Sequence, residues 1–167
     1  NFDEIPIDTN AYIQNEIPTF AYAGGFIPGM RDPRPFLDTL LEIDRPWKFI
    51  IYTRDERLVN KYVNMAEGKI ETRDYIPRPV LLKTLSEIDF LVNFENSSSM
   101  MMPSKLIDYY LTGRPVLSVG GSSVDKETLH RFLDGDYRQQ YSYNNIDRFR
   151  IENVCEKFLE LSGALNS

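Results

Sequence analysis

Residues 100–121 read MMMPSKLIDYYLTGRPVLSVGG, and this stretch contains the signals of one helix and one strand. Ser104, directly after a proline, is a typical helix N-cap, and Gly113 is a typical residue at a helix end. The apolar run PVLSV follows, with two glycines directly after it, and predicts a short strand. A helix that leads at once into such a strand predicts one unit of a parallel α/β fold.

The same alternation extends from this stretch toward both ends of the chain. Strands are expected over residues 19–25, 47–53, 69–76, 89–95, 115–120 and 137–143, and helices over residues 32–43, 57–68, 79–88, 103–113, 125–135 and 151–158. Parallel strands need crossover connections, which the intervening helices supply. The pattern therefore predicts a Rossmann-like, doubly wound parallel sheet of about six strands in an α/β fold.

Composition limits the class of protein. The chain has 167 residues and 42% hydrophobic content, which is enough for one domain with a buried core. A net charge of −6 leaves no broad basic surface and argues against nucleic acid as a partner. No run approaches the roughly 20 apolar residues that span a bilayer, and the single Cys155 leaves no intrachain disulfide. These features predict a cytoplasmic protein without a membrane span in this chain.

Two glycines end the first expected strand, at the edge of the sheet where ligands of such folds bind. Gly24 and Gly25 let the backbone approach a ligand without obstruction by Cβ atoms. Arg31 and Arg34 follow within a few residues and are candidates for phosphate contacts. The alternatives are an ordinary turn at the glycines and unremarkable surface arginines.

The helix start at Ser104 is a second candidate phosphate site. Its free amides carry partial positive charge, and Lys105 adds a full charge. A cation there is unfavourable by about 0.3–1 kcal/mol unless an anion binds, so the pair predicts a ligand contact, with simple capping as the alternative. Asp108, one turn on, points back toward the helix start and is a candidate acceptor for ribose hydroxyls. Its alternative role is a favourable charge in the first helical turn.

Three other features favour structural roles. The sequence Asp134-Gly135-Asp136 has the D-x-D spacing of some metal sites but follows an expected helix end, where it indicates a turn. His130 is the only histidine and has no cysteine cluster near it, which argues against a zinc site. Cys155 lies on an apolar helical face and is expected in the core. The sequence predicts no metal and no other cofactor.

Residues 89–119, DFLVNFENSSSMMMPSKLIDYYLTGRPVLSV, resemble the donor-binding half of retaining glycosyltransferases with the GT-B fold. In that family a strand ends in a polar loop, a Pro-Ser-Lys step opens a helix, and Gly-(Lys/Arg)-Pro-Val follows. FAYAGGF is similar to the family's first strand and glycine loop, and residues 141–161 are similar to its last strand and helix. The resemblance implies a C-terminal, family 4-like GT-B domain over residues 19–167, entered by an interdomain linker over residues 1–18.

The resemblance also implies roles for individual residues around a phosphate. Gly24 and Gly25 would border the donor diphosphate, with Arg31 as its cationic partner. Ser104 and Lys105 would hold phosphate at the helix start.

The remaining parts of the donor are implied by the same resemblance. The backbone around Ile76 would meet the nucleobase, and Asp108 would bind ribose in place of the second glutamate of the family's Glu-(seven residues)-Glu pattern. The position of the first glutamate falls on Met100, so its usual sugar contact is not carried over. Glu95 would have to reach the sugar from further back.

The implied function is a nucleotide-sugar-binding domain of a metal-independent, retaining glycosyltransferase, with a nucleoside diphosphate sugar as substrate and no cofactor. The acceptor site of that family lies on a separate N-terminal domain, and 167 residues accommodate only one such domain. The chain is therefore expected to be half an enzyme and inactive in transfer by itself. Two alternatives remain open: the donor half of a nucleotide-sugar epimerase, and a flavodoxin-like, non-catalytic interaction module. The second is weakened because the first expected strand ends in glycines and PVLSVGG has no lysine.

Overall fold

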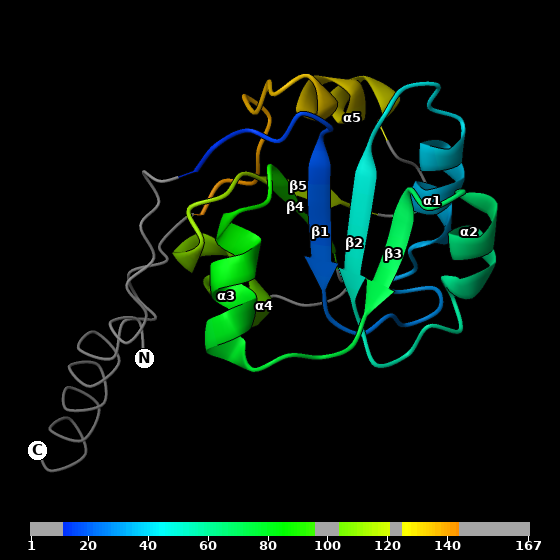
Figure 1. Ribbon diagram of the computed structural model, residues 1–167, viewed down its shortest axis with the longest axis horizontal. Coiled ribbons are helices and arrows are strands. Elements are labelled where there is room, and N and C mark those ends of the chain that lie inside the picture. Colours follow the sequence, from blue (N-terminus) through cyan, green and yellow to red (C-terminus); the bar gives the residue numbers. More distant parts are fainter. Residues whose placement is uncertain (1–11, 96–103, 121–124, 144–167) are drawn as a thin grey trace, which may run out of the picture.

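The protein forms a parallel sheet with helices on both faces (Figure 1); the computed structural model describes residues 12–95, 104–120 and 125–143. The elements are β1 (Thr19–Ala23), α1 (Arg34–Leu41), β2 (Lys48–Tyr52), α2 (Asn60–Met65), β3 (Ile70–Arg73), α3 (Arg78–Ser86), β4 (Phe90–Phe94), α4 (Ser104–Leu111), β5 (Val116–Val119) and α5 (Lys126–Leu133). The strand order is β3-β2-β1-β4-β5, and every pairing is parallel. This order confirms the expected doubly wound, Rossmann-like fold, whose direction reverses between β1 and β4.

The described sheet has five strands, because residues 137–143 do not form the expected sixth. This segment is irregular, and its backbone meets β5 through one hydrogen bond, from Tyr141 N to Val116 O at 2.8 Å. Aromatic contacts hold it in place, since the ring of Tyr143 packs edge-on against the rings of Tyr110 and Tyr141. The expected last helix, residues 151–158 with Cys155, lies outside the described residues.

Alternating residues of the strands pack into two apolar layers. On one face, Phe20 stacks on Phe49 and Phe90, with ring centroids 4.8 and 4.7 Å apart, beneath α1, α2 and α5. On the other face, small and branched side chains such as Ala21 and Leu91 lie beneath α3 and α4 (Figure 1). Burial of both faces explains why the strands are continuously apolar. Within the described residues, none of the helices has the length and apolar character needed to cross a membrane.

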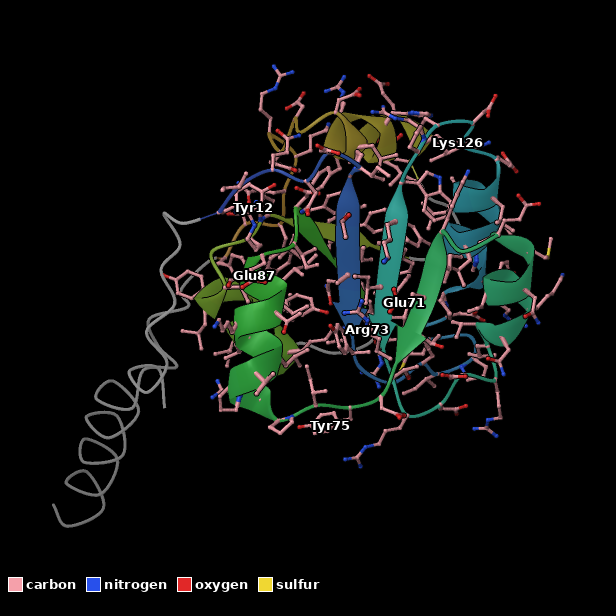
Figure 2. All side chains as sticks on the ribbon, in the orientation of Figure 1. Tyr12, Glu71, Arg73, Tyr75, Glu87 and Lys126 are labelled. Atoms are coloured by element: carbon pink, nitrogen blue, oxygen red, sulfur yellow. The ribbon has the colours of Figure 1, made fainter. Side chains whose placement is uncertain are left out.

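Asp89, immediately before β4, anchors the segment that enters the sheet. Its carboxylate is buried and accepts hydrogen bonds from Tyr12 Oη, from Asn15 N at 3.0 Å and from Thr19 N at 2.6 Å. Arg114 donates to the Asp89 carbonyl at 2.9 Å and stacks on the ring of Tyr12, the residue labelled in Figure 2. Residues 12–18, the described part of the lead-in to β1, are therefore fixed to the amino edge of the sheet, opposite the ends at which ligands of this fold bind.

Candidate functional site

A cavity of about 490 Å³ lies at the carboxyl ends of β1, β2 and β3, beside α3 and α4. In Figure 1 this edge is where the arrowheads of the three strands end. Its lining includes five of the eight residues predicted from the sequence: Gly24, Gly25, Ile76, Lys105 and Asp108. These residues come from two loops and one helix that are widely separated along the chain, and the parallel sheet brings them to one edge.

Glycine is suited to positions 24 and 25 for different structural reasons. Gly24 has φ +150°, and a Cβ added there would lie 2.9 Å from Tyr22 Oη, so both backbone conformation and space disfavour a side chain. Its N–H donates to Tyr52 O at 2.9 Å, which ties the loop to β2. A Cβ on Gly25 would meet nothing within 4 Å. Gly25 therefore presents open backbone to the cavity.

Lys105 has a buried ammonium group that meets no counter-ion among the described residues. It lies in the first turn of α4, and its Nζ is buried with no hydrogen-bond partner among the described residues. The ammonium group sits 4.7 Å from the centre of the Tyr22 ring. Burial, followed by repulsion from Arg31, lowers the pKa of Lys105 to about 7. A desolvated cation next to a second cation is unfavourable unless an anion joins them.

Arg31 is brought to this place by a tight hairpin after β1. Ile27 N donates to Arg31 O at 3.2 Å, and Arg31 N donates to Ile27 O at 2.9 Å, with Gly29 at φ +74° in the turn between them. The Nε atom of Arg31 is buried without a hydrogen-bond partner in the described structure. Arg34, the other arginine candidate, is instead bound to Asp32, whose pKa its hydrogen bonds lower to about 2. Arg31 is not among the residues that line the cavity, but its charge lowers the pKa of Lys105, so of the two arginines it is the one that acts on this lysine.

The carboxylate of Asp108 is held by an arginine that sequence reasoning missed. Arg78, the first residue of α3, donates from Nε to Asp108 Oδ1 at 2.8 Å, and its Nη2 lies 2.7 Å from the same oxygen. Both residues line the cavity. The signal that marked Lys105, a cation at a helix start, was also present at Arg78.

An aromatic and apolar region completes the cavity between β3 and α3. Ile76 is partly buried and lines it, and Tyr75 stands at the rim with 58% of its surface exposed. Figure 2 places Tyr75 in the connection between β3 and α3. The guanidinium carbon of Arg54 lies 4.7 Å from the centre of the Tyr75 ring. Neither Tyr75 nor Arg54 was singled out from the sequence, because an exposed aromatic in a loop carries no local signal.

The other predicted site residues lie outside this lining. Glu95 follows β4, donates from its N–H to Val119 O at 2.9 Å, and holds its carboxylate against Gly120. Ser104 is the first residue of α4, as expected for the helix start. Met100 lies outside the described residues.

The residues expected to have structural roles have ordinary surroundings where the structure describes them. Asp134 pairs with Arg45, and Asp136 pairs with Arg138. The hydrogen bonds from Arg138 lower the pKa of Asp136 to about 2. His130 is exposed on α5. The two aspartates of the D-x-D sequence are thus engaged in separate surface ion pairs.

The arrangement is suited to a ligand with an anion at one end and a flat apolar group at the other. Lys105 and the open glycine backbone line the cavity and, with the charge of Arg31 acting on Lys105, meet the first requirement; the Ile76 region meets the second. The Asp108 carboxylate, which lines the same cavity, is an acceptor for hydroxyl groups.

Three solved structures share the fold. The lipopolysaccharide outer core galactosyltransferase WaaB, in its apo form, has a TM-score of 0.62 at 16% sequence identity, over 96% of this chain and 54% of its own. Anabaena HepE, in complex with UDP-glucose, has a TM-score of 0.54 at 9% identity, over 74% of this chain and 40% of its own. AviGT4, a glycosyltransferase involved in avilamycin A biosynthesis, has a TM-score of 0.52 at 10% identity, over 81% of this chain and 47% of its own.

The shared property is the fold. The chain has the Rossmann-like architecture found in these GT-B structures, and it spans about half the length of WaaB. A scan against protein-family models finds no match, and a search of curated proteins finds no significant match.

Proposed function

We propose that this chain is the nucleotide-sugar-binding domain of a GT-B glycosyltransferase, equivalent to the C-terminal half of such an enzyme. The domain would extend over residues 19–167, with residues 1–18 as the lead-in from an acceptor-binding domain. The observation that carries the proposal is Lys105 beside an open glycine loop, with a buried Nζ that has no hydrogen-bond partner among the described residues and a pKa lowered by Arg31. The likeness to WaaB, HepE and AviGT4 supports it.

In this proposal the diphosphate of the donor binds between the glycine loop and the start of α4. Lys105 and Arg31 neutralise its two negative charges, while Gly24 and Gly25 admit it close to the backbone. The backbone amides around Ser104 add the partial charge of the helix start. When the sugar leaves, the same cations stabilise the charge that develops on the departing nucleoside diphosphate. The protein thus supplies by side chains the stabilisation that other transferases obtain from a metal, with retention of the anomeric configuration following from the family resemblance.

The places of the other parts of the donor follow from the order in which they are bonded: base, ribose, diphosphate and sugar. The nucleobase lies against the backbone at Ile76, and the ribose hydroxyls donate to Asp108, which stands between base and diphosphate. Glu95, at the end of β4, is the candidate for the sugar side.

Binding by this chain is expected to be weak because one wall of an interdomain cleft leaves part of the ligand in water. An affinity of roughly 1 mM corresponds to about −4 kcal/mol. Sugar transfer is not expected, since no acceptor is held in line with the anomeric carbon. The lowering of the activation barrier by about 7–11 kcal/mol that oriented reactants provide is therefore missing. Transfer by the purified chain above the level of a Lys105→Ala, Asp108→Asn double variant would contradict this.

The experiment that tests the proposal is a thermal-shift series with ADP, CDP, GDP and UDP at millimolar concentration. A ligand that binds only the native state raises the melting temperature, so we expect a shift with at least one diphosphate. Lys105→Ala should weaken binding of that diphosphate more than binding of its free nucleoside, since a charge-assisted contact is worth about 1.5–3 kcal/mol.

The matched control is Lys83→Ala, on the exposed side of α3. It should leave both affinities unchanged. Absence of a shift with every diphosphate, or equal losses for nucleoside and diphosphate in Lys105→Ala, would contradict the proposed site.

A further inference from the structure

The ion pair between Arg78 and Asp108 has an asymmetric geometry. Both contacts of the guanidinium fall on Oδ1, at 2.8 Å from Nε and 2.7 Å from Nη2. A fork-to-fork pair would engage both carboxylate oxygens. Here Oδ2 accepts no hydrogen bond from any described residue, and the side chain of Asp108 remains 29% exposed at the cavity. One oxygen is therefore fixed, and the other is left for a donor from outside.

The pair contributes little to the packing of the two helices that it joins. Leu85 of α3 and the α4 residues Leu106 and Tyr109 are already buried in one apolar cluster beneath these helices. Arg78 itself is 38% exposed, and pairs of this exposure contribute about 0–1 kcal/mol. Arg78 also places a cation at the start of α3, where the helix dipole disfavours it.

The pair does determine where the Asp108 carboxylate points. Asp108 lies three residues after Lys105 on α4, a spacing at which opposite charges on a helix ordinarily pair. The Lys105 Nζ nevertheless has no hydrogen-bond partner among the described residues. Arg78 therefore draws the carboxylate toward α3 and the Ile76 loop, and away from the cation.

We propose that Arg78 is a positioning residue that holds Asp108 for the ribose of a ribonucleotide and makes the site prefer ribose over deoxyribose. This inference rests on the proposed function. The phosphate-binding cation lies one turn before Asp108, and Ile76 lies two residues before Arg78. The Asp108 carboxylate thus stands between the diphosphate and base regions, which is the position that a nucleotide's ribose occupies.

The test compares the tightest-binding member of ADP, CDP, GDP and UDP with its 2′-deoxy and 3′-deoxy forms, by titration monitored with NMR. The unaltered chain should prefer the ribose form over at least one deoxy form by about tenfold, the value expected for a hydrogen bond to a charged acceptor. Arg78→Gln and Asp108→Asn should each reduce this preference to near one. In the Asp108→Asn background, Arg78→Gln should change the preference no further. Lys83→Gln, which removes an exposed charge from the same helix, should keep it.

Two results would overturn the positioning role. Equal weakening of ribose and deoxyribose forms by Arg78→Gln, in both backgrounds, would show that Arg78 contacts the phosphate or base directly. A lower melting temperature with an unchanged ribose preference would show that the pair only joins the two helices. Failure of the proposed function is distinguishable, because no nucleoside diphosphate would then bind the unaltered chain, and that result overturns both.

Discussion

Lys105→Met is expected to raise the melting temperature of the ligand-free protein at about pH 6 and to remove its stabilisation by nucleoside diphosphates. The lysine Nζ is buried over the Tyr22 ring, faces Arg31 and has no acceptor within the described residues. Its charged form is therefore destabilised in the empty site. Methionine fills similar space without a charge, so the variant loses the instability together with the phosphate contact.

The magnitude follows from the change in the pKa of Lys105 on folding. A fall from 10.5 to about 7, caused first by burial and then by Arg31, corresponds to about 5 kcal/mol at about 1.4 kcal/mol for each pH unit. Below pH 7 the whole of this instability is present, because folded and unfolded chains both carry the proton. Between pH 7 and 10.5 only the unfolded chain carries the proton, so the free energy of unfolding of the parent protein rises with pH. The stabilisation that Lys105→Met provides therefore shrinks to about 2 kcal/mol at pH 9.

The assay is thermal unfolding followed by circular dichroism at about pH 6 and about pH 9, with and without nucleoside diphosphate. At about 2–4 °C per kcal/mol for a domain of this size, the variant should melt about 10 °C higher at the lower pH and gain less than half of that at the higher pH. Lys83→Met, at an exposed position, is the control and should show no such pH dependence. A Lys105→Met variant that melts lower than the parent at pH 6, or gains equally at both pH values, would refute the reasoning.

Three further predictions concern the anchor of the lead-in, the glycine loop and the two arginines. Asp89→Ala should lower the free energy of unfolding by about 3 kcal/mol, because several donors lose a buried acceptor; a change below about 1 kcal/mol in urea denaturation would contradict this. Gly24→Ala should destabilise the fold by about 1–3 kcal/mol, because of the positive φ of Gly24 and a clash with Tyr22. Gly25→Ala should leave the melting temperature nearly unchanged but weaken diphosphate binding. Equal melting temperatures of the two variants would argue against the loop geometry. Arg31→Ala should weaken diphosphate binding about tenfold, while Arg34→Ala, which breaks an exposed ion pair, should not; the reverse order in a titration would reassign the phosphate contact.

The sequence predicts residues of the candidate site only where the signal for them lies within a few neighbouring residues. Lys105 at a helix start and the paired glycines after a strand are visible within a few residues, and the structure places them on one cavity. Arg31 and Arg34 are not separated by the same criteria, since both follow the glycines within ten residues in a proline-rich loop. Their difference arises from a backbone hairpin at Arg31, whose charge acts on Lys105, and from Asp32, which binds Arg34.

The sequence by itself determined the order of strands and helices and, through the need for crossovers, the doubly wound sheet; periodicity and helix ends are properties of about ten consecutive residues. Only the tertiary structure decided that residues 137–143 meet β5 through one backbone hydrogen bond instead of a strand ladder. It alone decided that Asp108 pairs with Arg78, 30 positions earlier in the sequence, and that the buried Nζ of Lys105 finds no partner in the part of the chain that the structure describes. Such pairings depend on the distance and angle at which α3 and α4 pack on the sheet, and no local pattern encodes them.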